Sequence, residues 1–236
     1  MLTELQKKTA QAIVNIFETG KALGDYAKVT VLPGDTGGLT FGRSQTTLNS
    51  GNLYKLIDAY CQSESARFAR NLEAYLNRLR QKDPTLNEDR ALHQALQKTA
   101  ADPVMHRVQD RFFDGAYWQP AQRAADALGI TDALGVAVVY DSRVHGSWIR
   151  IRDRVNARAG TPEDIGQRRW VRQYVNERRG WLANHRNKLL NKTVYRMDAF
   201  LDLINRRRWA LGLPLSVRGV MIDRGMFLRE PGNRGG

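Results

Sequence analysis

The sequence predicts a mostly α-helical protein with one small β region near its N-terminus. Apolar residues recur at helical spacing over residues 3–19, and again from about residue 52 almost to the C-terminus. Runs that favour β-structure stand out only at residues 29–32 and 39–41. The chain has 236 residues, enough for a real hydrophobic core. We expect one domain over residues 1–236, with two helical lobes, a β-hairpin region near 29–42 and a loose tail over about 224–236.

The first helix is expected over residues 3–19. Thr3 and Gln6 have the spacing of a capping box, and Gly20 is a typical helix stop. Glu18 then falls in the last turn, next to Phe17, where partial burial would suit a proton donor. Since charged side chains are mostly exposed, a solvated Glu18 is the alternative.

A turn cluster, residues 33–38, connects the two β-prone runs. It carries Asp35 between glycines, which allow the backbone to approach a ligand closely. Glu18 and Asp35 are therefore candidates for a pair of carboxyl groups of the kind glycosidases use, one donating a proton and one staying ionised. The alternative for Asp35 is a turn-forming aspartate that accepts a hydrogen bond from its own backbone.

Most of the remaining chain is expected to be helical. Asp83-Pro84 and Asp102-Pro103 interrupt the pattern, and a very apolar helix after Asp132 is expected to be buried on all sides. The expected ranges are 52–82, 89–100, 103–118, 120–128, 133–140, 163–187 and 197–211.

Composition restricts the function classes further. The formal net charge is +13, which implies an anionic partner or anionic surroundings. The single cysteine, Cys61, excludes an internal disulfide and suits a reducing compartment. No cofactor or metal is expected, because no nucleotide-binding loop is present and the histidines are scattered. They are His93, His106, His145 and His185.

Several segments together resemble the bacterial chitosanases, glycoside hydrolase family 46 of the lysozyme-like superfamily. The first is the helix ending in Glu18, followed by Gly34-Asp35 and Thr36-Gly37-Gly38. The second is the buried helix ending Tyr140-Asp141 and His145-Gly146. Weaker matches are Tyr174–Arg178 and Leu213–Gly219. The resemblance implies a lysozyme-like fold of two lobes around a cleft and a glycosidase activity.

The resemblance also implies roles for individual residues. Glu18 matches the family's general acid and Asp35 its general base, while Thr36 or Thr40 would hold the attacking water. Asp141 and Arg178 match a buried ionic network, to which we add His145 as a core residue rather than a catalytic one. Substrate binding is assigned to Asn52, Arg43, Gly37 and Gly38. The implied reaction is inverting hydrolysis of a β-1,4 bond.

One departure from the family bears on the substrate. Asn52 stands where the chitosanases carry an aspartate that binds a glucosamine amine. A neutral amide and a charge of +13 suit bacterial peptidoglycan better than polycationic chitosan. We therefore expect an endolysin-type, bacteriolytic cell-wall hydrolase. It would be a monomer made in the cytoplasm without a signal peptide and acting on the wall after release.

Three alternatives stay open. The chain could be a true chitosanase, or a cell-wall-binding protein without activity. It could also be a nucleic-acid-binding protein, since arginines and tryptophans alternate between Arg150 and Arg186. No base-reading motif accompanies that stretch, so no specific nucleic-acid partner is expected. No apolar run is long enough to span a membrane.

Overall fold

The computed structural model describes residues 2–32, 34–43 and 45–228. It is mostly helical with a small antiparallel sheet, as the sequence predicts. The chain forms two compact units. We call residues 2–23 with 116–228 the terminal unit, and residues 24–115 the middle unit.

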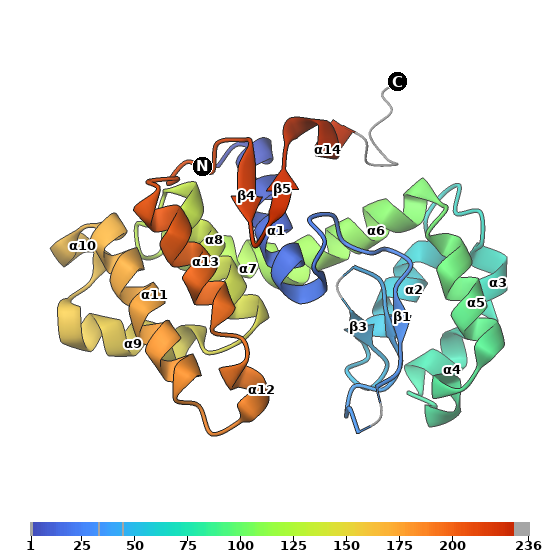
Figure 1. Ribbon diagram of the computed structural model, residues 1–236. Coiled ribbons are helices and arrows are strands. Elements are labelled where there is room, and N and C mark those ends of the chain that lie inside the picture. The colour runs from blue at the N-terminus through green and yellow to red at the C-terminus, as the bar shows by residue number, and fades with distance from the viewer. Residues whose placement is uncertain (1, 33, 44, 229–236) are drawn as a thin grey trace. The chain divides into compact units, whose positions relative to one another are not determined.

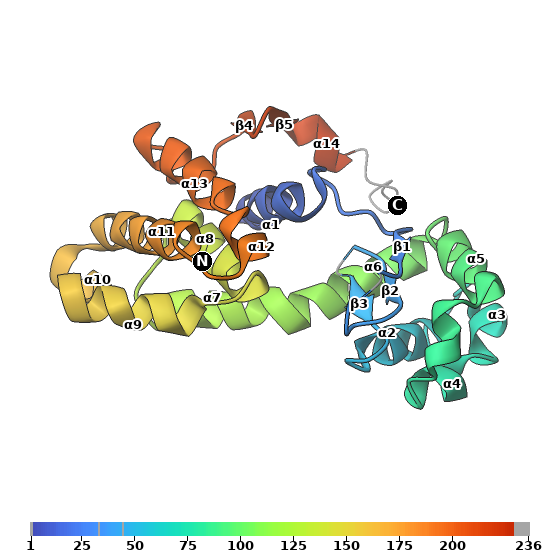
Figure 2. The same ribbon diagram turned by 60° about the horizontal axis from the view of Figure 1, so that its bottom comes forward.

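The terminal unit is built around the apolar helix α8. Every residue from Ala133 to Ser142 is buried, which confirms the expectation from its composition. Helices α1, α7, α9, α11 and α13 all contact α8, and α9 and α13 also pack on α11 (Figures 1 and 2). The elements of this unit are α1 (Glu4–Thr19), α7 (Gln119–Asp126), α8 (Ala133–Val144), α9 (Trp148–Ala159), α10 (Pro162–Ile165), α11 (Gln167–Ala183), α12 (Lys188–Asn191), α13 (Tyr195–Asn205), β4 (Leu215–Val217), β5 (Val220–Ile222) and α14 (Arg224–Leu228).

Helix α1 begins and ends as predicted. Thr3 and Gln6 form the complete capping box, and Gly20 caps the other end in the left-handed conformation with a φ of 76°. Residues 9–17 are buried, so the helix is fixed by packing as well as by its caps. This places Glu18 in the last turn of a well-anchored helix.

A second β-hairpin, β4–β5, was not predicted. Leu215 pairs with Ile222 and Val217 with Val220 across a turn in which Arg218 and Gly219 both have positive φ. Two such residues make the tight turn that suits the twist of a hairpin. The expectation of a single β element was therefore wrong, because strands of three residues leave almost no periodic signal.

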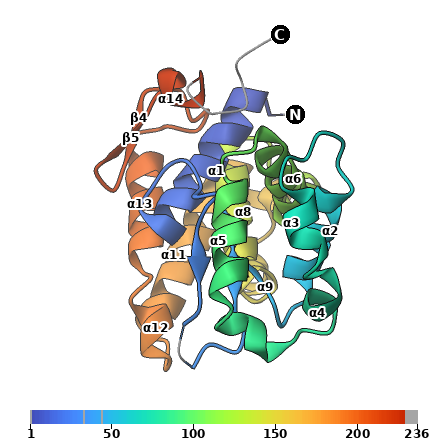
Figure 3. The same cartoon turned by 90° about the vertical axis from the view of Figure 1, so that its right-hand side faces the viewer.

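The middle unit combines a three-stranded antiparallel sheet, in the order β1-β2-β3 (Figure 2), with a set of helices (Figure 3). The sheet region and the helices share one hydrophobic core. Leu39 and Phe41 from the sheet region are fully buried in this core with Tyr60 and other helical residues. The elements are β1 (Val29–Thr30), β2 (Thr40–Phe41), β3 (Thr46–Thr47), α2 (Asn52–Cys61), α3 (Ala69–Glu73), α4 (Leu76–Arg80), the 3₁₀ helix η1 (Pro84–Asn87), α5 (Arg90–Thr99) and α6 (Pro103–Phe113). The chain leaves the unit inside a π-helix, η2 (Asp114–Trp118).

Several boundaries differ from the expectation. The helix expected over 52–82 is divided into α2, α3 and α4, and Gly166, with a φ of 82°, separates α10 from α11. Helix α13 ends at Asn205, before Arg207 takes a left-handed conformation. The first part of the expected loose tail is helix α14, and residues 229–236 lie outside the described residues. Within the described ranges, no helix combines the length and apolarity that crossing a membrane requires.

Candidate active site

Glu18 is exposed, but a buried arginine holds its carboxyl group. Arg196, at the start of α13, donates from Nη2 to Glu18 Oε1. The Arg196 side chain is only 2% exposed, whereas 43% of the Glu18 side chain is accessible. The Tyr195 hydroxyl donates to the carbonyl of Phe17 at 2.8 Å, which fixes α13 against the end of α1. One end of Glu18 is thus anchored in the protein while the residue stays accessible.

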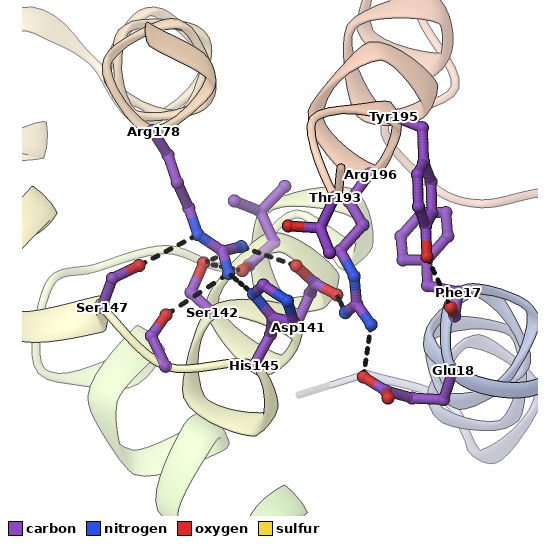
Figure 4. A network of polar contacts seen from close by, with 12 residues as sticks. Phe17, Glu18, Asp141, Ser142, His145, Ser147, Arg178, Thr193, Tyr195 and Arg196 are labelled. Atoms are coloured by element: carbon purple, nitrogen blue, oxygen red, sulfur yellow. Dashed lines mark hydrogen bonds and ion pairs between the residues drawn. The ribbon is translucent and has the colours of Figure 1, made fainter. Parts of the chain in front are cut away.

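A buried ionic network stands behind Glu18 (Figure 4). Asp141 accepts one hydrogen bond from Arg196 Nη1 and one from Arg178 Nη1, each at 2.6 Å, and all three side chains are almost fully buried. Arg178 also donates to Ser142 Oγ at 3.0 Å and to Ser147 Oγ at 3.2 Å. Because buried charges persist only when they are paired and hydrogen-bonded, these contacts explain how three ionic groups survive in the core.

The electrostatics of the network follow from its geometry. Burial alone would raise the pKa of Asp141, but the charges of Arg196 and Arg178 outweigh it and hold that pKa below the usual range. Burial would lower the pKa of Arg196, but the charges of Asp141 and Glu18 outweigh it and raise that pKa. The network therefore stays ionised across the physiological range.

His145 belongs to this network in its neutral form. Burial, together with the charges of Arg196 and Arg178, lowers the pKa of His145 to about 4. Its Nδ1 lies 3.1 Å from Arg178 Nη2. Because a guanidinium can only donate, Nδ1 accepts the hydrogen bond and the ring proton sits on Nε2. The histidine that was expected to be a core residue thus bonds through its ring to the Arg178 side chain.

Two further residues around Glu18 were not predicted from the sequence. Arg196 connects Glu18 to Asp141, and burial followed by the charge of Glu18 raises the pKa of Tyr117 in the π-helix η2. One signal could have pointed to Arg196. It is a cation on the apolar face of a helix, beside Met197 and Phe200, where a charge requires a buried partner.

Asp35 lies in the middle unit, in the exposed loop between β1 and β2. Its Oδ1 accepts a hydrogen bond from the Gly37 N–H at 3.1 Å, and its own N–H donates to the carbonyl of Leu32 at 3.1 Å. This is the local turn that the alternative for Asp35 describes. The turn engages Oδ1 and orients the carboxylate, so a turn role and a chemical role are compatible.

Two asparagines that were not predicted hold this loop in place. Asn49 Nδ2 donates to the carbonyl of Thr36 at 2.6 Å, and Asn87 Oδ1 accepts from the Leu39 N–H at 2.7 Å. Gly38 has a φ of 67°, and a Cβ there would lie 3.0 Å from Asn87 Oδ1. A Cβ on Gly37 would lie 3.1 Å from the Thr47 side chain. Both glycines thus serve the close packing of the loop.

The two candidate threonines differ in their surroundings. Thr40 is buried, and its hydroxyl oxygen lies 2.5 Å from Thr30 Oγ1 and 3.0 Å from the Thr30 carbonyl. Thr36 is exposed and lies next to Asp35. Of the two, only Thr36 presents its side chain on the surface of the loop.

Arg43 and Asn52 were both assigned to substrate binding. The Arg43 guanidinium is paired with Asp110 and is 9% exposed, and its backbone N–H donates to Gln109 Oε1 at 2.9 Å. This pairing ties the loop after β2 to helix α6 and does not favour a role in binding substrate. Asn52 is half-buried at the first position of α2, where its N–H donates to Ser50 Oγ at 3.2 Å.

No group of three or more histidine, cysteine, aspartate or glutamate residues within residues 2–32, 34–43 and 45–228 could hold a metal ion. Each unit carries one of the two candidate catalytic carboxyl groups, Glu18 in the terminal unit and Asp35 in the middle unit. Their separation, expected at roughly 6.5–9.5 Å or more for inversion, stays a prediction.

The family model of glycosyl hydrolase family 46 matches residues 12–215. The chain belongs to this family. The match includes Glu18, Asp35 and the whole Asp141–Arg178–Arg196 network. The protein is accordingly a glycoside hydrolase with the mostly helical fold of that family.

Relatives in sequence and structure agree with this assignment. The chain is 28% identical over 234 residues to a chitosanase of Bacillus subtilis (strain 168), covering 92% of this chain and 83% of the relative. The native chitosanase of Bacillus subtilis MY002 has a TM-score of 0.79 at 26% identity, covering 94% of this chain and all of the other. A Gynuella sunshinyii GH46 chitosanase in complex with chitotetraose has a TM-score of 0.78 at 26% identity, covering 94% and 98%.

Proposed function

We propose that this glycoside hydrolase cleaves chitosan. The observation that carries the proposal is the match to chitosanases along nearly the whole chain, in sequence and in fold. Two of the similar structures are complexes with a named sugar, chitotetraose in one and 6 GlcN in the other. Chitosan is thus favoured over the peptidoglycan expected from the charge and from Asn52.

The distribution of charge weakens the argument against chitosan. Residues 116–228 hold 20 Lys and Arg against 10 Asp and Glu, whereas residues 24–115 hold 12 against 11. The middle unit, which carries Asp35 and Asn52, is therefore nearly neutral. A polycationic chain that approaches this unit would meet far less repulsion than the net charge of +13 suggests.

In the proposed reaction, Glu18 donates a proton to the leaving glycosidic oxygen. Arg196 engages Oε1, so we assign the donation to Oε2. The buried Asp141 fixes the Arg196 guanidinium, and Arg178 fixes Asp141, so the acid is oriented by groups that cannot move independently. This is the arrangement that a positioned general acid needs.

Asp35 is proposed as the base that activates the attacking water on the opposite face of the sugar ring. Its turn with Gly37 orients the carboxylate and leaves Oδ2 for the water. Thr36 is the better placed of the two threonines to help hold that water, because the hydroxyl of Thr40 is buried against Thr30. The expected outcome is inversion, and initial release of the β-anomer from a β-linked substrate would rule it out.

The decisive experiment measures turnover of deacetylated chitosan and of purified peptidoglycan, by wild type and by Glu18→Gln. We expect wild type to degrade chitosan. Glu18→Gln should stay folded and lose on the order of 10²–10⁴ in rate, because an amide cannot donate the proton. Retained activity in a folded Glu18→Gln would remove Glu18 from the mechanism.

The effects of ionic strength and of a substitution at Asn52 on chitosan cleavage provide a second, independent test. If the positive terminal unit repels chitosan, added salt should raise the rate at low substrate concentration, because the Debye length falls to about 10 Å at 0.1 M. Asn52→Asp should lower KM for chitosan by supplying a charge for an ammonium group. Cleavage of peptidoglycan together with inert chitosan would reject the proposal and establish the endolysin-type alternative.

A further inference from the structure

A cationic groove lies at the end of the terminal unit that is remote from Glu18. It has a volume of about 830 Å³ and lies where the starts of α8 and α11 meet the end of α13. Its lining residues are Asp132, Arg168, Arg169, Arg172, Ile204, Asn205, Arg207, Trp209 and Ala210.

The groove is distinct from the site around Glu18. Gln6 Nε2 donates to the carbonyl of Ala210 at 3.2 Å, so the groove adjoins the first turn of α1, whereas Glu18 is in the last. Twelve residues of helix separate these positions, or about 18 Å at 1.5 Å per residue. Helix α13 shows the same separation. Arg196, which binds Glu18, is near its start, and Asn205, which lines the groove, is at its end.

The walls of the groove are held by polar contacts. Asp132 accepts from Arg168 Nε at 2.7 Å and Nη2 at 3.2 Å, and the Arg168 guanidinium lies 5.3 Å from the centre of the Trp209 ring. Trp209 is fixed in turn, because its carbonyl accepts from the Leu134 N–H at 2.9 Å. Arg172 donates to Asn205 Oδ1 at 2.9 Å. These contacts orient Arg168, Arg172 and Trp209 before any ligand arrives, which lowers the cost of binding.

The charges of the groove are poorly compensated. Four arginines line it against one carboxylate, Asp132, which already binds Arg168. Among the described ion pairs, none includes Arg169, Arg172 or Arg207. Arg207 also holds a left-handed conformation, with a φ of 55°, at the end of α13. Guanidinium groups gathered without carboxylates are suited to a multivalent anion.

Two other hollows in the same unit hold fewer arginines outside the described ion pairs. One, of about 550 Å³, contains Arg154 and Arg158, but Glu177 pairs with both. The other, of about 540 Å³, holds Arg143 and Arg150 beside apolar and aromatic residues such as Trp148 and Trp181. The remote groove thus holds three arginines outside the described ion pairs, more than either of the other two hollows.

We propose that this groove binds a phosphorylated ligand with more than one phosphate group. A phosphate group carries up to two negative charges and three acceptor oxygens, which suits several arginines facing one space. The volume lies in the range of small-ligand sites. Arg169, Arg172 and Arg207 bind the phosphate oxygens, and Arg168, stacked on Trp209, closes one wall. The proposal is independent of the polysaccharide that the enzyme cleaves.

The test is equilibrium binding of tripolyphosphate to the full-length enzyme, with citrate as an anion of similar charge that carries carboxylates. We expect saturable binding of tripolyphosphate, at least about tenfold tighter than that of citrate. The double variant Arg169→Gln/Arg207→Gln should weaken it by at least about tenfold. The matched control Arg150→Gln/Arg186→Gln removes the same charge from the other two hollows and should change the affinity by less than about threefold.

A single substitution that is expected to strengthen binding provides a further test. Asp132→Asn removes the carboxylate that competes for Arg168, so it should tighten tripolyphosphate binding several-fold. The Asp132 side chain makes no capping bond to α8, so the helix keeps its start. Equal weakening in both double variants would mean that only net charge matters, which would overturn the proposal. It would also be overturned if tripolyphosphate did not bind, if citrate bound equally well, or if Asp132→Asn weakened binding.

Discussion

Each unit buries one aspartate, and the two are satisfied in opposite ways. In the middle unit, Asp102 accepts from the Tyr60 hydroxyl at 2.6 Å and from the N–H groups of Arg67 and Val104 at 2.9 Å. In the terminal unit, Asp141 accepts only from two guanidinium groups, at 2.6 Å each. The first carboxylate depends on neutral donors, the second on buried charges.

Glu18 and Asp35, the two catalytic candidates, differ in the same way, in the kind of group that holds the carboxylate. Glu18 is held by Arg196 and, through it, by the buried charges, whereas Asp35 is held by the N–H of its own turn. Changes behind Glu18 should therefore affect folding and activity together. Changes at Asp35 should affect activity alone. The following predictions test this contrast, in order of decreasing effect on the free energy of unfolding.

The largest effect is expected from Asp141→Asn. The change leaves Arg178 and Arg196 buried without a counter-charge, which should lower the free energy of unfolding by about 3–5 kcal/mol. The matched control is Asp102→Asn in the middle unit, which keeps an acceptor for some of its donors and should cost about 1–3 kcal/mol. Urea unfolding of both variants gives the comparison.

Activity should separate these two variants further. Asp141→Asn frees the guanidinium that holds Glu18, so turnover should fall even where the protein is folded. Asp102→Asn should retain turnover, because the hydrogen bonds of Asp102 are with Tyr60, Arg67 and Val104 and not with the loop that carries Asp35. A stability loss at Asp102 equal to that at Asp141 would contradict the distinction between neutral and charged partners.

The next prediction concerns pH and His145. Its pKa is lowered to about 4 in the folded protein from an ordinary 6.5, so between these values the unfolded chain binds more protons. Stability should thus fall as pH falls from about 6.5 to 4, with His145 contributing at most about 1.4 kcal/mol per pH unit. The lowered pKa of Asp141 extends the loss in the same direction below its ordinary 3.8.

The substitution His145→Gln isolates this contribution. Glutamine can still accept a hydrogen bond from Arg178 but does not titrate. The slope of the free energy of unfolding against pH between 4 and 6.5 should therefore decrease by an amount that corresponds to the uptake of up to one proton. Urea unfolding at a series of pH values measures it. An unchanged slope would place the acid sensitivity elsewhere in the molecule.

The same contrast explains which features of the molecule could be predicted from the sequence. The ends of α1 and the burial of α8 were predictable, because Thr3, Gln6, Gly20 and an unbroken apolar run act through neighbours in the chain. Glu18 and Asp35 were candidates from the residues themselves, and the resemblance assigned roles to them and to Asp141 and Arg178. Most of the features that the sequence did not predict depend on contacts between segments that are distant in the chain.

Arg196 is the clearest case, because it lies 178 residues from Glu18 in the chain and no local pattern links them. Asn87 is another, since it supports the Asp35 loop from 48 residues away. Hairpin β4–β5 escaped for a different reason, because strands of three residues are too short for a periodic signal. Local signals predicted most of the helices, while the support of both carboxylates came from tertiary packing.

The smallest effect on stability is expected from Asp35→Asn. The side chain is exposed, and asparagine can still accept from the Gly37 N–H through Oδ1. The free energy of unfolding should therefore change by less than about 0.5 kcal/mol. Turnover should nonetheless fall on the order of 10²–10⁴, because an amide cannot take a proton from water.

The pH profile decides between the two readings of Asp35. The acidic limb of kcat/KM reports a base that must be ionised, so it should disappear in Asp35→Asn if Asp35 is that base. A variant that keeps both its stability and its acidic limb would show that Asp35 only shapes the turn. In that case the contrast between the units would still hold for folding, but the catalytic base would have to be sought elsewhere in the chain.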